Sequence, residues 1–179
     1  EPVQPINYYT QTKFEAEQEA ARCAGALIVR SIFYGWSHGQ GNLSIAEWAV
    51  NELTAGHCIK GFNDIRISSL YVFDLAELIE KALTEELTGV YNFASSDSVT
   101  KYELLMMIAR TFGFEPALIS PILIDTVGFQ GKRSKNLSLS PDKLCDAIGV
   151  SCPTVESGIN RFYQDRVQMS EYRNTNVVH

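Results

Sequence analysis

Tyr9 and Lys13 are the two residues whose types and spacing most directly suggest chemistry. They are four positions apart, and positions i and i+4 of an α-helix lie on one face, so a phenol and an ammonium group would point into one site. A free tyrosine has a pKa of about 10 and exchanges protons poorly at neutral pH, whereas a nearby cation favours the phenolate. Such a tyrosine can protonate a carbonyl oxygen as hydride reaches the carbonyl carbon. The same spacing is common on helix surfaces, so a purely structural pair stays open.

The elements that would position this pair alternate between helical and strand patterns. Residues 8–23 are rich in Glu, Ala, Gln and Lys, which favour a helix, and the apolar run 26–30 fits a strand buried on both faces. Further helices are expected at about 43–54, 73–86, 101–112, 141–149 and 155–169, and further strands at 59, 65–68 and 90–94. This alternation predicts an α/β fold with a largely parallel sheet.

The helix expected at 101–112 carries the clearest boundary signals. Thr100 followed by Glu103 forms a capping-box pattern, and Gly113 supplies a C-terminal stop. Ser140 and Pro141 predict the start of a later helix, with the serine as N-cap and the proline as first helical residue. The polar residues 173–179 are expected to fray.

The composition is that of an ordinary globular domain. The 179 residues are 45% hydrophobic and carry a net charge of −6, which argues against a disordered chain and against a strongly basic nucleic-acid-binding surface. The longest apolar stretches, such as 104–109, are far shorter than the ~20 residues of a membrane span. Only Cys145 and Cys152 are close in sequence among the four cysteines, and no metal-ligand spacing occurs. We therefore expect free thiols, no metal and a cytoplasmic protein.

Several ordered motifs resemble those of the extended short-chain dehydrogenase/reductases. They lie at residues 5–17, 27–35, 66–76, 89–95 and 132–137. The first resembles the active-site helix of that family, with Pro5, Tyr9, Lys13 and a later acidic residue. The last departs from the family because Ser134 stands where proline is usual. Together the motifs are most similar to those of the dTDP-4-dehydrorhamnose reductases.

This resemblance implies a Rossmann-like parallel sheet with helices, followed by a small C-terminal substrate-binding region. It also implies an oxidoreductase that uses NADP or NAD to reduce a nucleotide-activated keto-sugar in carbohydrate biosynthesis. By the same likeness, Tyr9 is the catalytic acid/base, and Lys13 lowers the pKa of that phenol and binds the nicotinamide ribose. Ser31, Ile32 and Phe33 would border the cofactor.

Three further residues are candidates for the substrate side by this resemblance: Asn42, Arg66 and Arg133. Arginine suits a diphosphate because its planar fork can bond two oxygens at once. The alternatives are structural: Arg66 could pair with a surface carboxylate, and Arg133 could belong to a solvated basic loop beside Lys132 and Lys135.

Two parts of the family's fold are expected outside this sequence. One is a catalytic Ser or Thr upstream of the tyrosine, and the other is the Gly-rich dinucleotide turn. We therefore expect residues 1–179 to be the C-terminal part of an extended short-chain reductase, inactive alone and weak in binding cofactor. The glycine-rich stretch 35–41 is a poorer candidate for that turn, because Trp36 and His38 are bulky there.

Two other functions stay open. A non-catalytic relative can keep this fold as a binding module, as the regulatory subunit of methionine adenosyltransferase does. Nucleotide-sugar epimerases and dehydratases use the same Tyr–Lys pair with bound NAD. The sequence distinguishes neither the sugar nor NAD from NADP, and it leaves open whether the protein forms a homo-oligomer. Neither a nucleic acid nor a membrane is expected as a partner.

Overall fold

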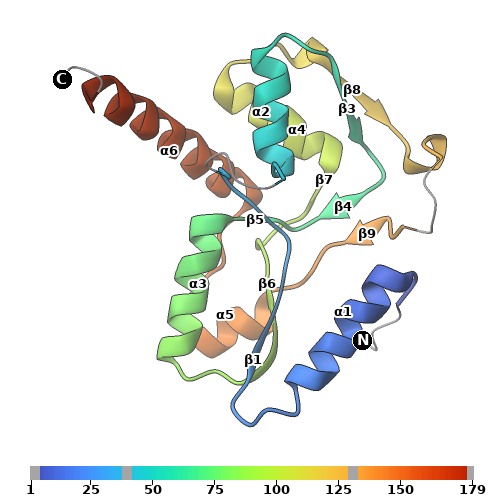
Figure 1. Ribbon diagram of the computed structural model, residues 1–179, viewed down its shortest axis with the longest axis vertical. Coiled ribbons are helices and arrows are strands. Elements are labelled where there is room, and N and C mark those ends of the chain that lie inside the picture. The colour runs from blue at the N-terminus through green and yellow to red at the C-terminus, as the bar shows by residue number, and fades with distance from the viewer. Residues whose placement is uncertain (1–4, 38–41, 129–132, 177–179) are drawn as a thin grey trace.

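The computed structural model describes residues 5–37, 42–128 and 133–176. Figure 1 shows two groups of elements, one in the lower and one in the upper part of the view, with the last helix projecting to one side. Helices and short, mostly parallel strands alternate along the chain, so the α/β prediction is confirmed.

The lower group is built around a pair of parallel strands. Its elements are α1 (Tyr8–Ala20), β1 (Leu27–Ser31), α3 (Val72–Thr84), β6 (Gly89–Phe93) and α5 (Asp142–Ile148). β1 and β6 pair in parallel, with Leu27 opposite Gly89 and Ser31 opposite Phe93. Helices α3 and α5 lie on one side of the strands in Figure 1 and α1 lies on the other. A buried apolar cluster fills the α3 and α5 side and includes Leu75, Leu78, Phe93, Leu144 and Ile148.

β1 is less buried than its apolar sequence predicts. The expectation of a strand buried on both faces is wrong: Val29 is 37% exposed, and the other four residues are only partly buried. The physical reason is that α1, on the open side of the strand, has no buried residue and so provides little cover.

The upper group contains most of the remaining strands. Its elements are α2 (Ile45–Thr54), β3 (Ile59–Phe62), β4 (Arg66–Ile67), β7 (Val99–Thr100), α4 (Lys101–Phe112), η1 (Pro116–Leu118), β8 (Ile119–Ile122), η2 (Ile124–Thr126) and β9 (Asn136–Leu137). β3 pairs in parallel with β8, and β4 lies between β7 and β9. The pairing of β4 with β7 is antiparallel, and that of β4 with β9 is parallel.

Local signals define α4 as expected. The Thr100 hydroxyl accepts a hydrogen bond from the Glu103 N–H, and the Glu103 carboxylate accepts one from the Thr100 N–H, so both halves of the capping box form. Gly113 ends the helix in the left-handed conformation at φ 73°. Helix α5 differs slightly, because Pro141 rather than Ser140 is the N-cap residue, and the Ser140 hydroxyl instead exchanges hydrogen bonds with Asp142.

Aromatic packing joins the two groups through the last helix, α6 (Val155–Asn176). The Phe162 ring lies 5.7 Å from the rings of both Tyr34 and Tyr71, and all three side chains are buried. Those tyrosines belong to β2 (Phe33–Tyr34) and β5 (Leu70–Tyr71), which pair in parallel.

Helix α6 is longer than predicted. It continues through Asn176, beyond the expected end at 169 and into the tail 173–179 that was expected to fray. No Gly or Pro follows Gly158 in this helix, so nothing in its sequence breaks it. Residues 177–179 lie outside the described part.

The described residues contain neither a membrane-spanning helix nor a cluster of metal ligands. No helix in this part of the chain combines the length and the apolar character needed to cross a membrane. Within the same residues, no three His, Cys, Asp or Glu side chains gather where they could hold a metal ion.

A substitution at Gly61 tests how closely β3 packs on α4. A Cβ atom at this position would lie 2.7 Å from the Cα atom of Tyr102, which belongs to the α4 backbone. We expect Gly61→Ala to lower the free energy of unfolding by about 1–3 kcal/mol, because strand and helix must separate. Urea denaturation measures the change.

Gly128→Ala is the matched control for Gly61→Ala. Nothing lies within 4 Å of its added Cβ, and its φ is not positive. We expect an effect within about 0.5 kcal/mol. Equal losses of stability in the two variants would contradict the packing argument.

Candidate functional site

Tyr9 and Lys13 lie on one face of α1, as their spacing predicts. The Lys13 Nζ atom is 5.7 Å from the centroid of the Tyr9 ring, and both side chains are exposed, Tyr9 by 67%. A reciprocal cap builds the first turn of this helix: the Asn7 side chain accepts from the Thr10 N–H at 2.9 Å, and the Thr10 hydroxyl accepts from the Asn7 N–H at 3.1 Å. The phenol and the ammonium group are thus presented together at the capped end.

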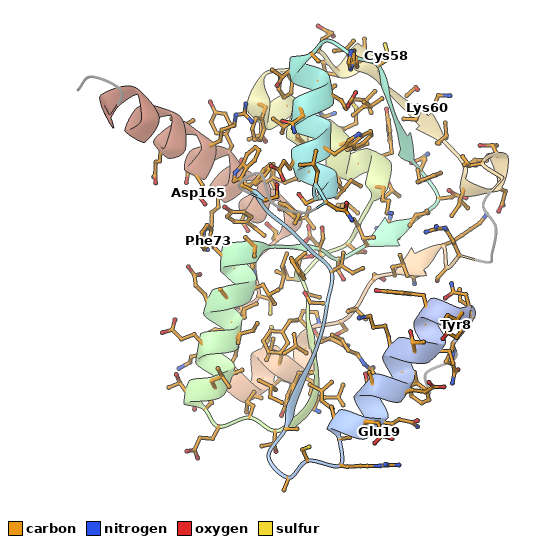
Figure 2. The ribbon with its side chains drawn as sticks, viewed as in Figure 1. Tyr8, Glu19, Cys58, Lys60, Phe73 and Asp165 are labelled. Carbon is orange, nitrogen blue, oxygen red and sulfur yellow. The ribbon has the colours of Figure 1, made fainter. Side chains whose placement is uncertain are left out.

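A bidentate ion pair fixes α1 against β1. The Nε and Nη2 atoms of Arg30 donate to the two carboxylate oxygens of Glu17 at 2.7 and 2.5 Å, and this contact raises the pKa of Arg30. Tyr9, Lys13 and Glu17 follow one another at intervals of one helical turn and so share one face of α1. The Glu17–Arg30 ion pair therefore orients the helix face that carries Tyr9 and Lys13. Figure 2 labels Tyr8 at the end of α1 that lies nearer β9 in this view.

The carboxyl end of β1 offers an unsatisfied polar atom beside exposed apolar surface. The Ser31 Oγ atom is buried and has no hydrogen-bond partner among the residues that the structure describes. The next residue is held in the sheet, since the Ile32 carbonyl accepts from the Leu70 N–H at 2.9 Å. Phe33 follows with 59% of its side chain exposed. A buried hydroxyl without a partner is costly, and the described residues carry the same cost at the hydroxyls of Tyr34 and Ser69.

Arg66 lines a shallow cavity in the upper group. Its Nη1 atom donates to the Ser98 carbonyl at 2.7 Å and to the Ser98 hydroxyl at 3.2 Å. The cavity has a volume of about 360 Å³, and its other lining residues are Val99, Tyr102, Glu103, Met106, Met107 and Arg110. Arg66 is therefore held by backbone and hydroxyl oxygens rather than by the surface carboxylate that was its structural alternative.

Positive charge gathers beside Arg66. Burial, and then the nearby charge of Arg133, lower the pKa of Lys101. Lys101 directly follows Thr100, which lies opposite Arg66 in the β4–β7 pairing. Lys135 forms ion pairs with Asp125 and Asp64, at 2.6 and 3.1 Å. Two guanidinium groups, those of Arg66 and Arg110, line the cavity together with one carboxylate, that of Glu103, which accepts a hydrogen bond from the Thr100 N–H.

Asn42 lies on a different element from the two arginines. It is exposed and stands two residues before Ser44, the N-cap of α2, whose hydroxyl donates to the Gly35 carbonyl at 2.8 Å. Gly35 itself is required by packing, because a Cβ atom there would lie 2.6 Å from the Val72 side chain. Residues 38–41 of the glycine-rich stretch, with His38, lie outside the described residues, as does Lys132.

Sequence reasoning gave no role to three residues that shape the site. Glu17 and Arg30 were present in the motifs but were not recognised as partners, although a charged residue inside an apolar strand is a signal that a partner exists. Lys101 carried no sequence signal, because its closeness to Arg133 depends on how distant segments pack.

A comparison with protein-family models matches residues 1–168 to the RmlD substrate binding domain. The chain belongs to that family. Similar solved structures include dTDP-4-dehydrorhamnose reductase from Bacillus anthracis str. Ames in complex with NADP, with a TM-score of 0.82 and 23% identity over 92% of this chain and 58% of that chain. The Clostridium acetobutylicum enzyme has a TM-score of 0.79 and 21% identity, over 94% of this chain and 58% of that chain.

Other relatives share the fold but carry different names. A dTDP-glucose 4,6-dehydratase from Bacillus anthracis str. Ames in complex with NAD has a TM-score of 0.75 and 18% identity over 96% of this chain and 55% of that chain. Methionine adenosyltransferase 2 subunit beta of Danio rerio is 27% identical over 165 residues, which are 82% of this chain and 47% of that protein. The chain thus spans about half the length of the proteins it matches, and the likeness confirms a partial Rossmann-like fold.

Because the Glu17–Arg30 pair holds α1 against β1, we expect the helix to open more readily when this pair is removed. In Glu17→Gln, Arg30 loses its charged partner, and we expect the amides of residues 12–20 to exchange hydrogen about tenfold faster, as for a loss of roughly 1.4 kcal/mol in local stability. Hydrogen–deuterium exchange with mass spectrometry measures the rate.

Glu19→Gln on the same helix is the control for this experiment. Glu19 pairs with Arg22, and both side chains are largely exposed, so we expect a rate change of less than about twofold. Unchanged exchange in Glu17→Gln would show that α1 is held by something else.

Proposed function

We propose that this chain is the C-terminal part of a longer cytoplasmic enzyme that reduces a nucleotide-activated keto-sugar with NADPH or NADH. The observation that carries the proposal is the presentation of Tyr9 and Lys13 on one exposed face of α1, oriented by the Glu17–Arg30 pair. The names of the similar reductases support it, as does the NADP bound in the Bacillus anthracis structure. In that protein, the dinucleotide-binding part would precede this chain, which supplies the active-site helix, the last Rossmann strands and the substrate-binding region.

The residues at the end of β1 fit a nicotinamide cofactor. A carboxamide group both donates and accepts hydrogen bonds, so it can satisfy the buried Ser31 hydroxyl that lacks a partner. The exposed ring of Phe33 offers apolar surface to a flat heterocycle. Ser31, Ile32 and Phe33 would border the nicotinamide, and the ammonium of Lys13 would bind the ribose hydroxyls. When bound, the reduced cofactor supplies the hydride.

Tyr9 and Lys13 would manage the proton in this reaction. The Tyr9 phenol donates its proton to the carbonyl oxygen of the sugar as negative charge develops there. The ammonium of Lys13, on the same helix face, stabilises the phenolate that remains. Because Tyr9 is 67% exposed in this chain, solvent can return the proton to it.

The basic residues around β4 and β7 would bind the diphosphate of the substrate. Arg66 is oriented by Ser98 and lines the cavity, while Arg133 and Lys101 add positive charge nearby. Arginine can bond two phosphate oxygens at once, and the apolar lining of Met106 and Met107 gives the rest of the ligand a surface to pack on. Asn42 is a third candidate on the substrate side.

A specific observation favours a second function. The curated relative at 27% identity is named a subunit of a methionine adenosyltransferase, and this identity exceeds that of the solved reductases described above. In that case the chain keeps the fold as a module that binds a partner protein. An epimerase or dehydratase activity is the third possibility, supported by the dehydratase with bound NAD.

Tyr9→Phe in the full-length protein tests the reductase proposal. We expect turnover of a dTDP-4-dehydro-sugar, followed as NADPH or NADH consumption, to fall by about 10²–10⁴-fold, because the proton donor is removed. The matched control is Tyr8→Phe, an adjacent tyrosine that is 85% exposed, which should keep its turnover. Melting curves should be the same for both variants.

Other outcomes of that experiment decide against the reductase. Retention of turnover in Tyr9→Phe would exclude the tyrosine as acid/base. A wild-type protein that reduces no keto-sugar but elutes with a methionine adenosyltransferase catalytic subunit would favour the binding module. Conversion of the substrate with no net consumption of cofactor would indicate an epimerase or dehydratase.

Arg66→Gln tests the substrate side separately. We expect the KM for the nucleotide sugar to rise about 10–100-fold with little change in kcat, since a charge-assisted contact to the diphosphate is lost far from the reacting carbonyl. Lys60→Gln, an exposed cation on β3, should leave both constants unchanged. Titration with dTDP should show the same loss of affinity in Arg66→Gln, and equal binding by the two variants would contradict the assignment.

A further inference from the structure

Cys145 and Cys152 lie in contact although seven positions separate them in the sequence. Their Sγ atoms are 2.8 Å apart. Both are free thiols. A disulfide bond has a length of about 2.0 Å, so the two sulfur atoms need to approach by less than about 1 Å to form one. Sequence reasoning predicted free thiols and noted only that these two are close along the chain.

The fold holds these two sulfur atoms together. Cys145 lies on α5, one turn before the end of the helix at Gly149, and its carbonyl accepts from the Gly149 N–H at 2.9 Å. Gly149 has a φ of 67°, a left-handed conformation that turns the chain back toward the helix. Cys152, three residues later, is only 6% exposed and packs in the apolar cluster with Leu144 and Ile148. The glycine turn and the packing thus fix the separation of the sulfur atoms.

The two thiols differ in access to solvent. Cys145 is partly exposed, whereas Cys152 is buried. Burial, followed by the hydrogen bond with Cys145, raises the pKa of Cys152 to about 12. An oxidant from solution therefore meets Cys145 first, and Cys152 is placed behind it.

We propose that Cys145 and Cys152 form a redox-active dithiol that closes reversibly into a disulfide when it meets a small disulfide oxidant such as oxidised glutathione. The Cys145 thiolate attacks one sulfur of glutathione disulfide, forming a mixed disulfide and releasing one glutathione thiolate. Cys152 then loses its proton to solvent and attacks the Sγ atom of Cys145, which releases the second glutathione. The protein dithiol is oxidised by two electrons, and one glutathione disulfide is reduced to two thiols.

Closure would tie α5 to the segment that supports the end of β6. The Pro153 carbonyl, next to Cys152, accepts from the Ser96 N–H at 2.9 Å, just beyond β6. The bond would close a short loop of α5 and its glycine turn and restrict the unfolded chain. In Figure 1, α1 lies on the opposite side of β1 and β6 from α5, and the inference does not depend on the proposed function.

The test uses the chain with both exposed cysteines replaced, Cys23→Ser and Cys58→Ser, so that only the pair remains. Incubation with millimolar oxidised glutathione is followed by intact-mass spectrometry and by peptide mapping without reduction. We expect the loss of two hydrogen atoms, a linked peptide joining positions 145 and 152, and reversal by a reducing agent. The thermal midpoint should rise by about 5 °C on oxidation.

Two further variants on this background test the order of attack. Cys152→Ala should trap one glutathione on Cys145, whereas Cys145→Ser should gain almost none, because Cys152 is buried. A chain that keeps both thiols free under this treatment, or that carries stable glutathione on Cys145 with Cys152 intact, would overturn the proposal. Links between chains rather than within one would overturn it equally.

Discussion

The ion pair between Glu17 and Arg30 is the interaction on which the candidate site depends. Helix α1 has no buried side chain, so hydrophobic packing contributes little to its position. An exposed ion pair stabilises a protein by at most about 1 kcal/mol. The Glu17–Arg30 pair has the features that strengthen such a contact: the guanidinium donates to both carboxylate oxygens, and the side chains are only 34% and 19% exposed. It connects the helix that carries the Tyr–Lys pair to the strand that ends in Ser31.

The two regions that carry the candidate residues therefore differ in how they are held. Arg66 lies on a strand with a partner on each side, and the following residue, Ile67, is 2% exposed in the core. Tyr9 stands on a helix attached mainly through one polar contact. A fixed guanidinium suits recognition of a diphosphate, whereas under the proposed function Tyr9 would donate its proton more efficiently once bound ligand excludes water from the phenol.

Local signals predicted local features well. The face shared by Tyr9 and Lys13 and the capping box at Thr100 follow from spacing within one or two helical turns, and the structure contains both. The exposure of Val29 was missed because burial depends on what covers a strand, not on the apolar character of the strand itself. The contact of Cys145 with Cys152 was missed because it requires a left-handed turn whose path the sequence does not reveal.

Contacts between residues that are distant in the sequence could not be predicted either. The oxygens that orient Arg66 belong to Ser98, which is 32 positions away, and this contact exists only because β4 and β7 pair antiparallel. Sequence could suggest arginine for a diphosphate on chemical grounds. It could not tell whether Arg66 would meet a carboxylate, a carbonyl or solvent, and these alternatives differ in how much binding capacity the guanidinium keeps.

The stability of the fold without a ligand is relevant to the choice between a reductase and a binding module. The aromatic contacts among Tyr34, Tyr71 and Phe162 stabilise the fold in a reductase and in a binding module alike, so they do not discriminate. Among the described residues, the hydroxyls of Ser31, Tyr34 and Ser69 are all buried without a hydrogen-bond partner. Each polar atom of this kind destabilises the fold by about 1–3 kcal/mol. Such a cost is reasonable where a ligand supplies the missing hydrogen bond. Ser31 stands two residues before Phe33, whose side chain is 59% exposed, so of these hydroxyls it is the one to which the proposed function gives a ligand.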